Sequence, residues 1–139
     1  MTAVRNAIRA PMLAVVALMS SPGAGRLPVP APPPPGIVGQ CAFTTISWVG
    51  QRLADASGRP LDPSPGSSVT LANGVRGVAY EDVPAIQKSH VGDRVMTCLA
   101  KLPTHCPPGD DRGKWYTTTN LRTDESWMLP DAEHMCGGA

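Results

Sequence analysis

A short run of charged and aromatic residues near the C-terminus is the best candidate for a binding site. It consists of Asp110, Asp111, Arg112, Lys114 and Trp115. Prolines and a glycine precede the run, which favours a rigid loop. Binding surfaces commonly use aromatic side chains on rigid loops. We therefore expect these five residues to contact a protein or a component of the cell envelope, with Trp115 pointing outward from its strand.

Four cysteines form the second group with chemistry of its own, namely Cys41, Cys98, Cys106 and Cys136. An even number of cysteines in a chain with an export signal indicates two disulfides. Three pairings are possible, and the sequence does not choose among them. We favour Cys41 with Cys136, which would tie the start of the domain to its end, and Cys98 with Cys106, which would brace a long loop.

The same cysteines could instead hold a metal ion or act as a nucleophile. His105 adjoins Cys106 and His134 lies two residues before Cys136, but there is no Cys-x-x-Cys pair, and the ligand spacing is not that of a zinc site. A catalytic thiol would need a base and an orienting group, and neither is identifiable. We therefore expect no metal and no cofactor.

The acidic residues allow a similar alternative. Asp110 and Asp111 with Asp131 and Glu133 could form a carboxylate pair or a calcium loop, yet the ligand alternation of a calcium loop is missing. His90, near Asp93, is interpreted as a surface residue rather than a general base. A solvated acidic loop is the simpler interpretation.

The N-terminus has the pattern of a secretory signal peptide over residues 1–25. Arg5 and Arg9 precede an apolar run from Met12 to Met19, and small and turn residues follow it. The run is shorter than the roughly 20 apolar residues of a spanning helix. We expect cleavage between Ser21 and Ala31, a secreted or periplasmic protein, and no membrane span in the mature form.

Residues 26–39 are rich in proline and are expected to form a semi-rigid linker. The whole chain has 12 basic and 11 acidic residues, for a net charge of +1. Removal of residues 1–25 takes away Arg5 and Arg9, which leaves ten basic against eleven acidic residues and a net charge of −1. Because nucleic-acid binders are strongly basic, we expect no nucleic-acid partner.

Residues 40–139 combine short apolar runs with frequent turn signals and lack a helical stripe, which favours a single β domain. Asn73-Gly74 predicts a two-residue hairpin turn that places Leu71 opposite Arg76. The core face of this hairpin would then carry Val69, Leu71, Val78 and Tyr80. Asp82 is a possible N-cap for one or two helical turns beginning at Pro84.

A further strand is expected from Arg94 to Leu102, followed by a long loop and a second hairpin. In that hairpin Asn120 would oppose Trp127, and alternation would place five residues on the core face, namely Tyr116, Thr118, Asn120, Trp127 and Leu129. The expected fold is all-β: a small antiparallel barrel or sandwich of about six short strands with two disulfides.

Several segments of the C-terminal half resemble a group of small cysteine-containing proteins that bacteria export and that have no assigned activity. The resemblance rests on Cys98-Leu99, Leu102-Pro103, Cys106-Pro107-Pro108-Gly109-Asp110-Asp111-Arg112-Gly113, Tyr116, Asn120-Leu121-Arg122-Thr123, Ser126-Trp127, Leu129-Pro130, His134 and Cys136-Gly137-Gly138-Ala139. It implies bacterial export and supplies no activity.

Two function classes follow from the sequence. The leading hypothesis is a non-enzymatic exported binding or structural module that contacts a protein or an envelope component. The alternative is a small secreted hydrolase, or a cysteine- and histidine-based enzyme, whose site only the fold would assemble.

Overall fold

The computed structural model of the chain describes residues 29–138. The predicted signal peptide and the first residues of the predicted linker lie outside this part. Six strands form one antiparallel sheet in the order β3-β2-β1-β4-β5-β6. The strands are β1 (Cys41–Gln51), β2 (Ser67–Leu71), β3 (Arg76–Val78), β4 (Arg94–Lys101), β5 (Trp115–Asn120) and β6 (Ser126–Pro130), and one short helix, α1 (Pro84–Gln87), lies between β3 and β4. The predicted all-β class is confirmed.

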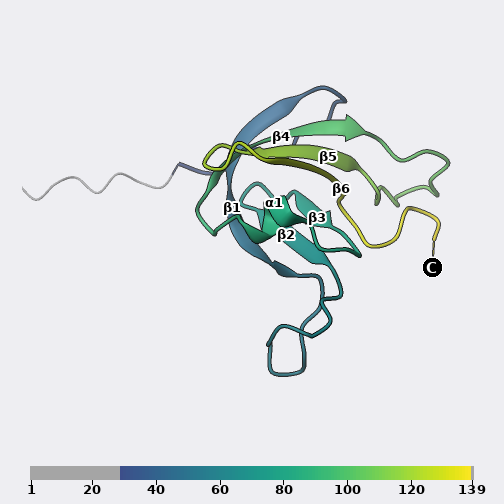
Figure 1. The fold of residues 1–139 in the computed structure, drawn as a ribbon. Coiled ribbons are helices and arrows are strands. Elements are labelled where there is room, and N and C mark those ends of the chain that lie inside the picture. Colours follow the sequence, from purple (N-terminus) through teal and green to yellow (C-terminus); the bar gives the residue numbers. More distant parts are fainter. Residues whose placement is uncertain (1–28, 139) are drawn as a thin grey trace, which may run out of the picture.

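The long strand β1 curls the sheet because its two halves have different neighbours. Residues 41–45 pair with β4, and residues 46–51 pair with β2. The register shifts between Ile46 and Trp48, and such a bulge bends a strand and increases its twist. The sheet therefore closes far enough for its edge strands, β3 and β6, to touch, which gives a half-barrel (Figure 1).

The hydrophobic core fills the concave side of this half-barrel. Its buried members are Ile46, Val69, Leu71, Val75, Ile86, Val95, Leu99, Tyr116 and Trp127. The helix α1 contributes Ile86 and packs against β1, β2 and β6. The predicted core positions of Tyr116 and Trp127 are confirmed, and Thr118 and Asn120 are buried beside them as expected.

The first hairpin differs from its predicted register by one residue. Thr70, not Leu71, lies opposite Arg76. The turn contains three residues rather than two, because the Leu71 amide donates to the Val75 carbonyl oxygen at 2.8 Å and Gly74 takes a left-handed conformation at φ +90°. This is the bulged turn that also favours glycine at that position. Val75 is buried as a result, and Tyr80, predicted to be in the core, is 60% exposed.

The second hairpin differs from its predicted register by two residues. Thr118, not Asn120, lies opposite Trp127, because the loop is longer and closes through the Asn120 amide, which donates to the Glu125 carbonyl oxygen at 2.9 Å. A shift of two residues preserves the face of every side chain, since strand side chains alternate with period two. The predicted core face was therefore right although the register was wrong.

The predicted helix start was also wrong in detail. Val83 occupies the N-cap position of α1 without a side-chain cap, and its amide donates to Ser67 Oγ at 2.9 Å. Asp82 instead accepts a hydrogen bond from Ser64 Oγ at 2.6 Å. The helix is one turn long, as the sequence suggested.

The disulfides are Cys41–Cys98 and Cys106–Cys136, so the favoured pairing was wrong. Cys41 and Cys98 lie directly opposite each other on β1 and β4, with their Cα atoms 4.0 Å apart. Cys106 and Cys136 lie in two loops that meet at one end of the sheet. Strand order, which the sequence does not show, decided the pairing: β4 lies beside β1, whereas Cys136 follows β6 at the far edge of the sheet.

Candidate functional site

The predicted binding residues lie at the end of the half-barrel, in the connection from β4 to β5. The Cys106–Cys136 disulfide joins this connection to the segment after β6. We call residues 102–114 together with residues 131–138 the stapled loop. The structure brings the five predicted residues together in the stapled loop and at its junction with β5.

The charged side chains of the stapled loop are paired with one another. Arg112 donates two hydrogen bonds to Asp110, each of 2.8 Å, and the Gly137 amide donates to the same carboxylate at 3.0 Å. These bonds hold the pKa of Asp110 well below its usual range, with the Arg112 side chain as the main cause. Lys114 forms an ion pair with Asp111, which lowers the pKa of Asp111. The four charges therefore neutralise one another within the loop.

Two contacts that sequence reasoning missed fix the shape of the stapled loop. Asp131 accepts hydrogen bonds from the backbone amides of Gly113 and Lys114, at 2.7 and 3.0 Å. The Cys136 amide donates to the Arg112 carbonyl oxygen at 3.1 Å. Asp131 was predicted as part of a solvated acidic loop, and its position after a strand offered no signal for this bracing role.

Trp115 is half-buried rather than freely exposed. It lines a hollow of about 180 Å³ together with Pro103, Gly113, Met135 and Cys136. Its strand position puts it on the same side of β5 as Thr117, the side that faces away from the core. The predicted outward direction is therefore correct.

The ionisable residues considered for catalysis do not converge. All four cysteines are in disulfides. His90, His105 and His134 are exposed, and between residues 29 and 138 no group of three or more His, Cys, Asp or Glu side chains could hold a metal ion. No helix in that range is long and apolar enough to cross a membrane.

A buried polar network near α1 explains several charged residues that could otherwise suggest a site. Asp93 accepts two hydrogen bonds from Arg122, at 2.7 and 2.9 Å, and one from Asn120 Nδ2 at 2.8 Å. Asn120 is fully buried and also donates to Ser89 Oγ at 2.8 Å. The network joins the β5–β6 loop to the turn before β4. The Arg122 side chain is about half exposed, but its Nε and Nη2 groups are bonded to Asp93 and to the Lys88 carbonyl oxygen, so we assign the network a structural role.

The convex side of strands β1, β4, β5 and β6 is a largely uncharged surface. We define the convex face by the side chains opposite to the core in the paired parts of these strands: Cys41, Phe43, Thr45, Arg94, Met96, Cys98, Thr117, Thr119, Ser126 and Met128. Arg94 is the one charged member of this set, and a second charged residue, Lys101, pairs with Trp115 at the edge of the same surface. Phe43 is 58% exposed and Met128 is 55% exposed. The sequence did not indicate this surface, because the apolar residues on it are far apart in the chain.

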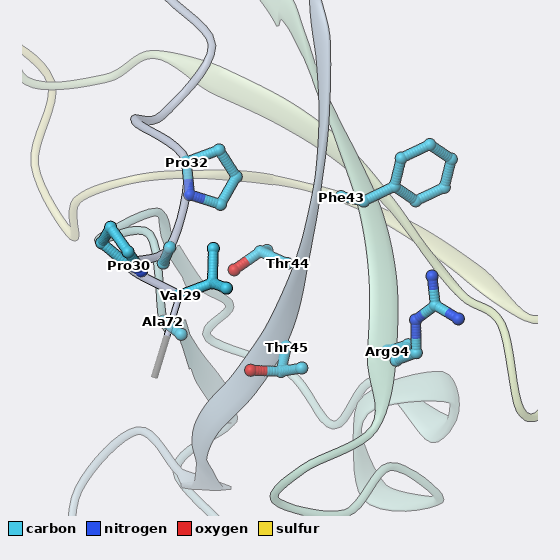
Figure 2. A pocket seen from close by; sticks show the side chains of 9 residues that line it. Val29, Pro30, Pro32, Phe43, Thr44, Thr45, Ala72 and Arg94 are labelled. Atoms are coloured by element: carbon cyan, nitrogen blue, oxygen red, sulfur yellow. The ribbon is translucent and has the colours of Figure 1, made fainter. Parts of the chain in front are cut away.

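The proline-rich segment at residues 29–35, which we call the proline arm, crosses the end of the concave side. Pro35 is buried, and Tyr116 donates a hydrogen bond from its hydroxyl to the Pro35 carbonyl oxygen at 3.2 Å. Burial raises the pKa of Tyr116 above its ordinary value. Figure 2 shows Thr44 on β1 directed toward the arm, whereas Phe43 and Arg94 point to the other side.

Comparisons with protein-family models, with curated proteins and with solved structures found no match.

Proposed function

We propose that the protein is a non-enzymatic exported module that binds a protein or an envelope component through its convex face. The exposed Phe43 and Met128 carry this proposal. Large apolar side chains that remain uncovered on a mostly uncharged strand surface are typical of protein contact sites. Trp115 lies at the edge of the same surface and extends it toward the stapled loop.

The state of the other candidate residues supports binding over the alternative of a hydrolase or a cysteine-based enzyme. The charges of Asp110, Asp111, Arg112 and Lys114 are already paired, so they shape the loop rather than attack or protonate a substrate. Sulfur atoms in disulfides are not available as thiolate nucleophiles. We infer that the stapled loop holds Trp115 in place for contact.

Two independent features support a proposal for the location. Two disulfides are typical of proteins in an oxidising compartment. The basic and apolar pattern of residues 1–25 is that of an export signal, and the resemblance to exported bacterial proteins agrees with it. We therefore propose that the protein is secreted or periplasmic, with residues 26–39 linking the signal peptide to the β domain.

Site-specific photo-crosslinking in the producing cells tests the contact surface. A photo-reactive amino acid is placed at position 43 and, as the matched control, at position 91, because Val91 is exposed to a similar extent, 64% against 58%, but lies in the turn before β4. We expect a covalent adduct with one envelope protein from position 43 and none from position 91. The substitution Met128→Ser should lower the adduct yield from position 43.

An absence of adducts at position 43, or equal adducts at both positions, would contradict the proposed surface. Turnover of a substrate by purified protein that has no free thiols would favour the hydrolase alternative.

A further inference from the structure

We propose that the groove beneath the proline arm is a second binding site, which takes extended proline-rich peptides from another molecule, and that the arm is its resident occupant. We call this the arm groove. It adjoins the convex face, because Phe43, Thr45 and Arg94 also line its hollow, but Thr44 points to the opposite side of β1 from Phe43 (Figure 2).

The arm is fixed at one end and weakly held along the rest. At its root, Gln40 Oε1 accepts hydrogen bonds from the amides of Gly36 and Ile37, at 3.0 and 3.3 Å, and the Gly39 amide donates to the Leu99 carbonyl oxygen at 2.8 Å. Residues 29–34, in contrast, are all exposed. Five of the seven arm residues are prolines, which have no N–H group to donate. The arm can therefore leave the groove while its root stays in place.

The floor of the groove offers hydrogen-bond donors to a ligand that has only acceptors. Tyr116 donates its hydroxyl to the Pro35 carbonyl oxygen. Thr44 is 8% exposed, and its hydroxyl is buried without a hydrogen-bond partner among the described residues. A polyproline backbone presents unpaired carbonyl oxygens at regular spacing and no donors. The chemistry of the floor thus matches that of the occupant.

The arm fills the groove incompletely. A hollow of about 450 Å³ is lined by Val29 and Pro30 of the arm and by Thr44 and Ala72 of the sheet, among others. A second hollow, of about 190 Å³, lies beside Pro34 and is lined by Val75, Lys114 and Tyr116 among others. A ligand that reached Thr44 would satisfy a buried hydroxyl that the arm leaves unpaired, which gives it an advantage over the arm.

Peptide recognition of this kind uses a preformed polyproline helix that loses little entropy on binding. The arm competes as an intramolecular ligand at a high effective concentration. We therefore expect the groove to bind a peptide in trans weakly while the arm is intact and more tightly once the arm can no longer adopt the polyproline conformation.

Fluorescence anisotropy with a labelled peptide of the sequence of residues 26–36 tests this in the full secreted chain. The arm variant carries Pro30→Gly, Pro32→Gly, Pro33→Gly, Pro34→Gly and Pro35→Gly, so that the segment bonded to the Tyr116 hydroxyl can also leave the groove. We expect the arm variant to bind the peptide at least about tenfold more tightly than the wild type, since the competing occupant is lost. A peptide with serine at every proline should bind neither protein.

Two matched pairs of substitutions in the arm variant locate the peptide. Tyr116→Phe and Thr44→Val should each weaken binding about threefold to tenfold, the cost of one hydrogen bond. Tyr80→Phe is the control for the first, because the Tyr80 hydroxyl donates to the Glu133 carbonyl oxygen outside the groove at 3.3 Å. Thr118→Val is the control for the second, since its hydroxyl is paired with Thr97 in the core at 3.0 Å. Neither control should change the affinity.

The proposal is overturned if the arm variant binds no more tightly than the wild type, or if the serine peptide binds equally well. If the arm variant does not fold, millimolar peptide is added to the wild type and backbone amide shifts are recorded. Shifts confined to residues around Thr44, Val75 and Tyr116 support the proposal, and their absence refutes it.

Discussion

The substitution Asp93→Asn should destabilise the fold and also make its stability less dependent on pH. Asp93 is buried and accepts four hydrogen bonds: two from Arg122, one from Asn120 and one from the His90 amide, all between 2.7 and 2.9 Å. Asparagine has the same shape but replaces one acceptor oxygen with a donor and removes the charge that pairs with Arg122. Hydrogen bonds to charged groups contribute roughly 1.5–3 kcal/mol each. Because Arg122 is about half exposed and can be rehydrated, we expect a loss of about 2–3 kcal/mol in the free energy of unfolding at pH 7.

The pH dependence follows from the direction of the pKa shift. The Arg122 hydrogen bonds, and then that of Asn120, hold the pKa of Asp93 well below its ordinary value of 3.8. A group with a lowered folded-state pKa stabilises the protein above its unfolded-state pKa, and this contribution is lost as the pH falls below that value. The difference in stability between the wild type and Asp93→Asn should therefore be largest at pH 7 and should shrink toward pH 3.

Urea unfolding followed by tryptophan fluorescence at pH 7, 5 and 3 measures this difference. Asp55→Asn is the control: Asp55 also has a lowered pKa, about 2, through hydrogen bonds with Ser57 and Arg59, but it lies in a surface loop. We expect its urea midpoint at pH 7 to move less than that of Asp93→Asn. Equal midpoints for the wild type and Asp93→Asn at pH 7, or a difference that does not change with pH, would refute the role of the network.

Three further predictions concern stability in urea. Thr44→Val should raise the free energy of unfolding by about 1 kcal/mol, because it removes a buried hydroxyl that has no hydrogen-bond partner among the described residues. Thr118→Val should lower the free energy of unfolding, because it removes a hydroxyl that is bonded to Thr97. Equal effects of the two substitutions would contradict this difference in hydrogen bonding. Gly113 and Gly109 both have a positive φ, so alanine at either position should lower the free energy of unfolding by about 1 kcal/mol. A Cβ atom at position 113 would also meet the side chain of Met135, whereas a Cβ atom at position 109 would meet nothing. Gly113→Ala should therefore lower the free energy of unfolding more than Gly109→Ala. Two double variants each remove one disulfide by replacing both of its cysteines with alanine. The Cys41–Cys98 bridge spans 57 residues and the Cys106–Cys136 bridge spans 30, so each variant should lose about 4 kcal/mol of unfolding free energy, and the two losses should differ by less than about 1 kcal/mol. A difference above about 2 kcal/mol would show that loop length does not govern them.

The strands and the core face could be predicted because alternation depends on neighbours in the sequence. Tyr116 and Trp127 were assigned correctly to the core, although the loop between their strands closed two residues away from its predicted position. In the first hairpin, the error in the predicted turn changed which side chains are buried. One extra residue in the turn at Gly74 moved Val75 into the core and left Tyr80 in solvent, where its ring lies 4.3 Å from the Arg52 guanidinium.

The presence of two disulfides was predicted correctly, but their pairing and the convex face could not be predicted, because both depend on strand order. Loop length favoured a bridge from Cys41 to Cys136, yet β4 lies next to β1 and brings Cys98 to Cys41. The convex face combines Phe43 with Met128 from opposite edges of a four-stranded surface. For the stapled loop, the sequence located the charges but not their mutual pairing, which only the fold of the loop determines.

Both binding proposals depend on the protein being exported and oxidised, and one measurement tests this most directly. Intact mass spectrometry of the protein from the periplasm or medium, before and after alkylation without reductant, reports the N-terminus and the free thiols together. We predict a chain that has lost its N-terminal residues by cleavage between Ser21 and Ala31 and that takes up no alkylating reagent. A full-length chain with alkylated cysteines would contradict the account.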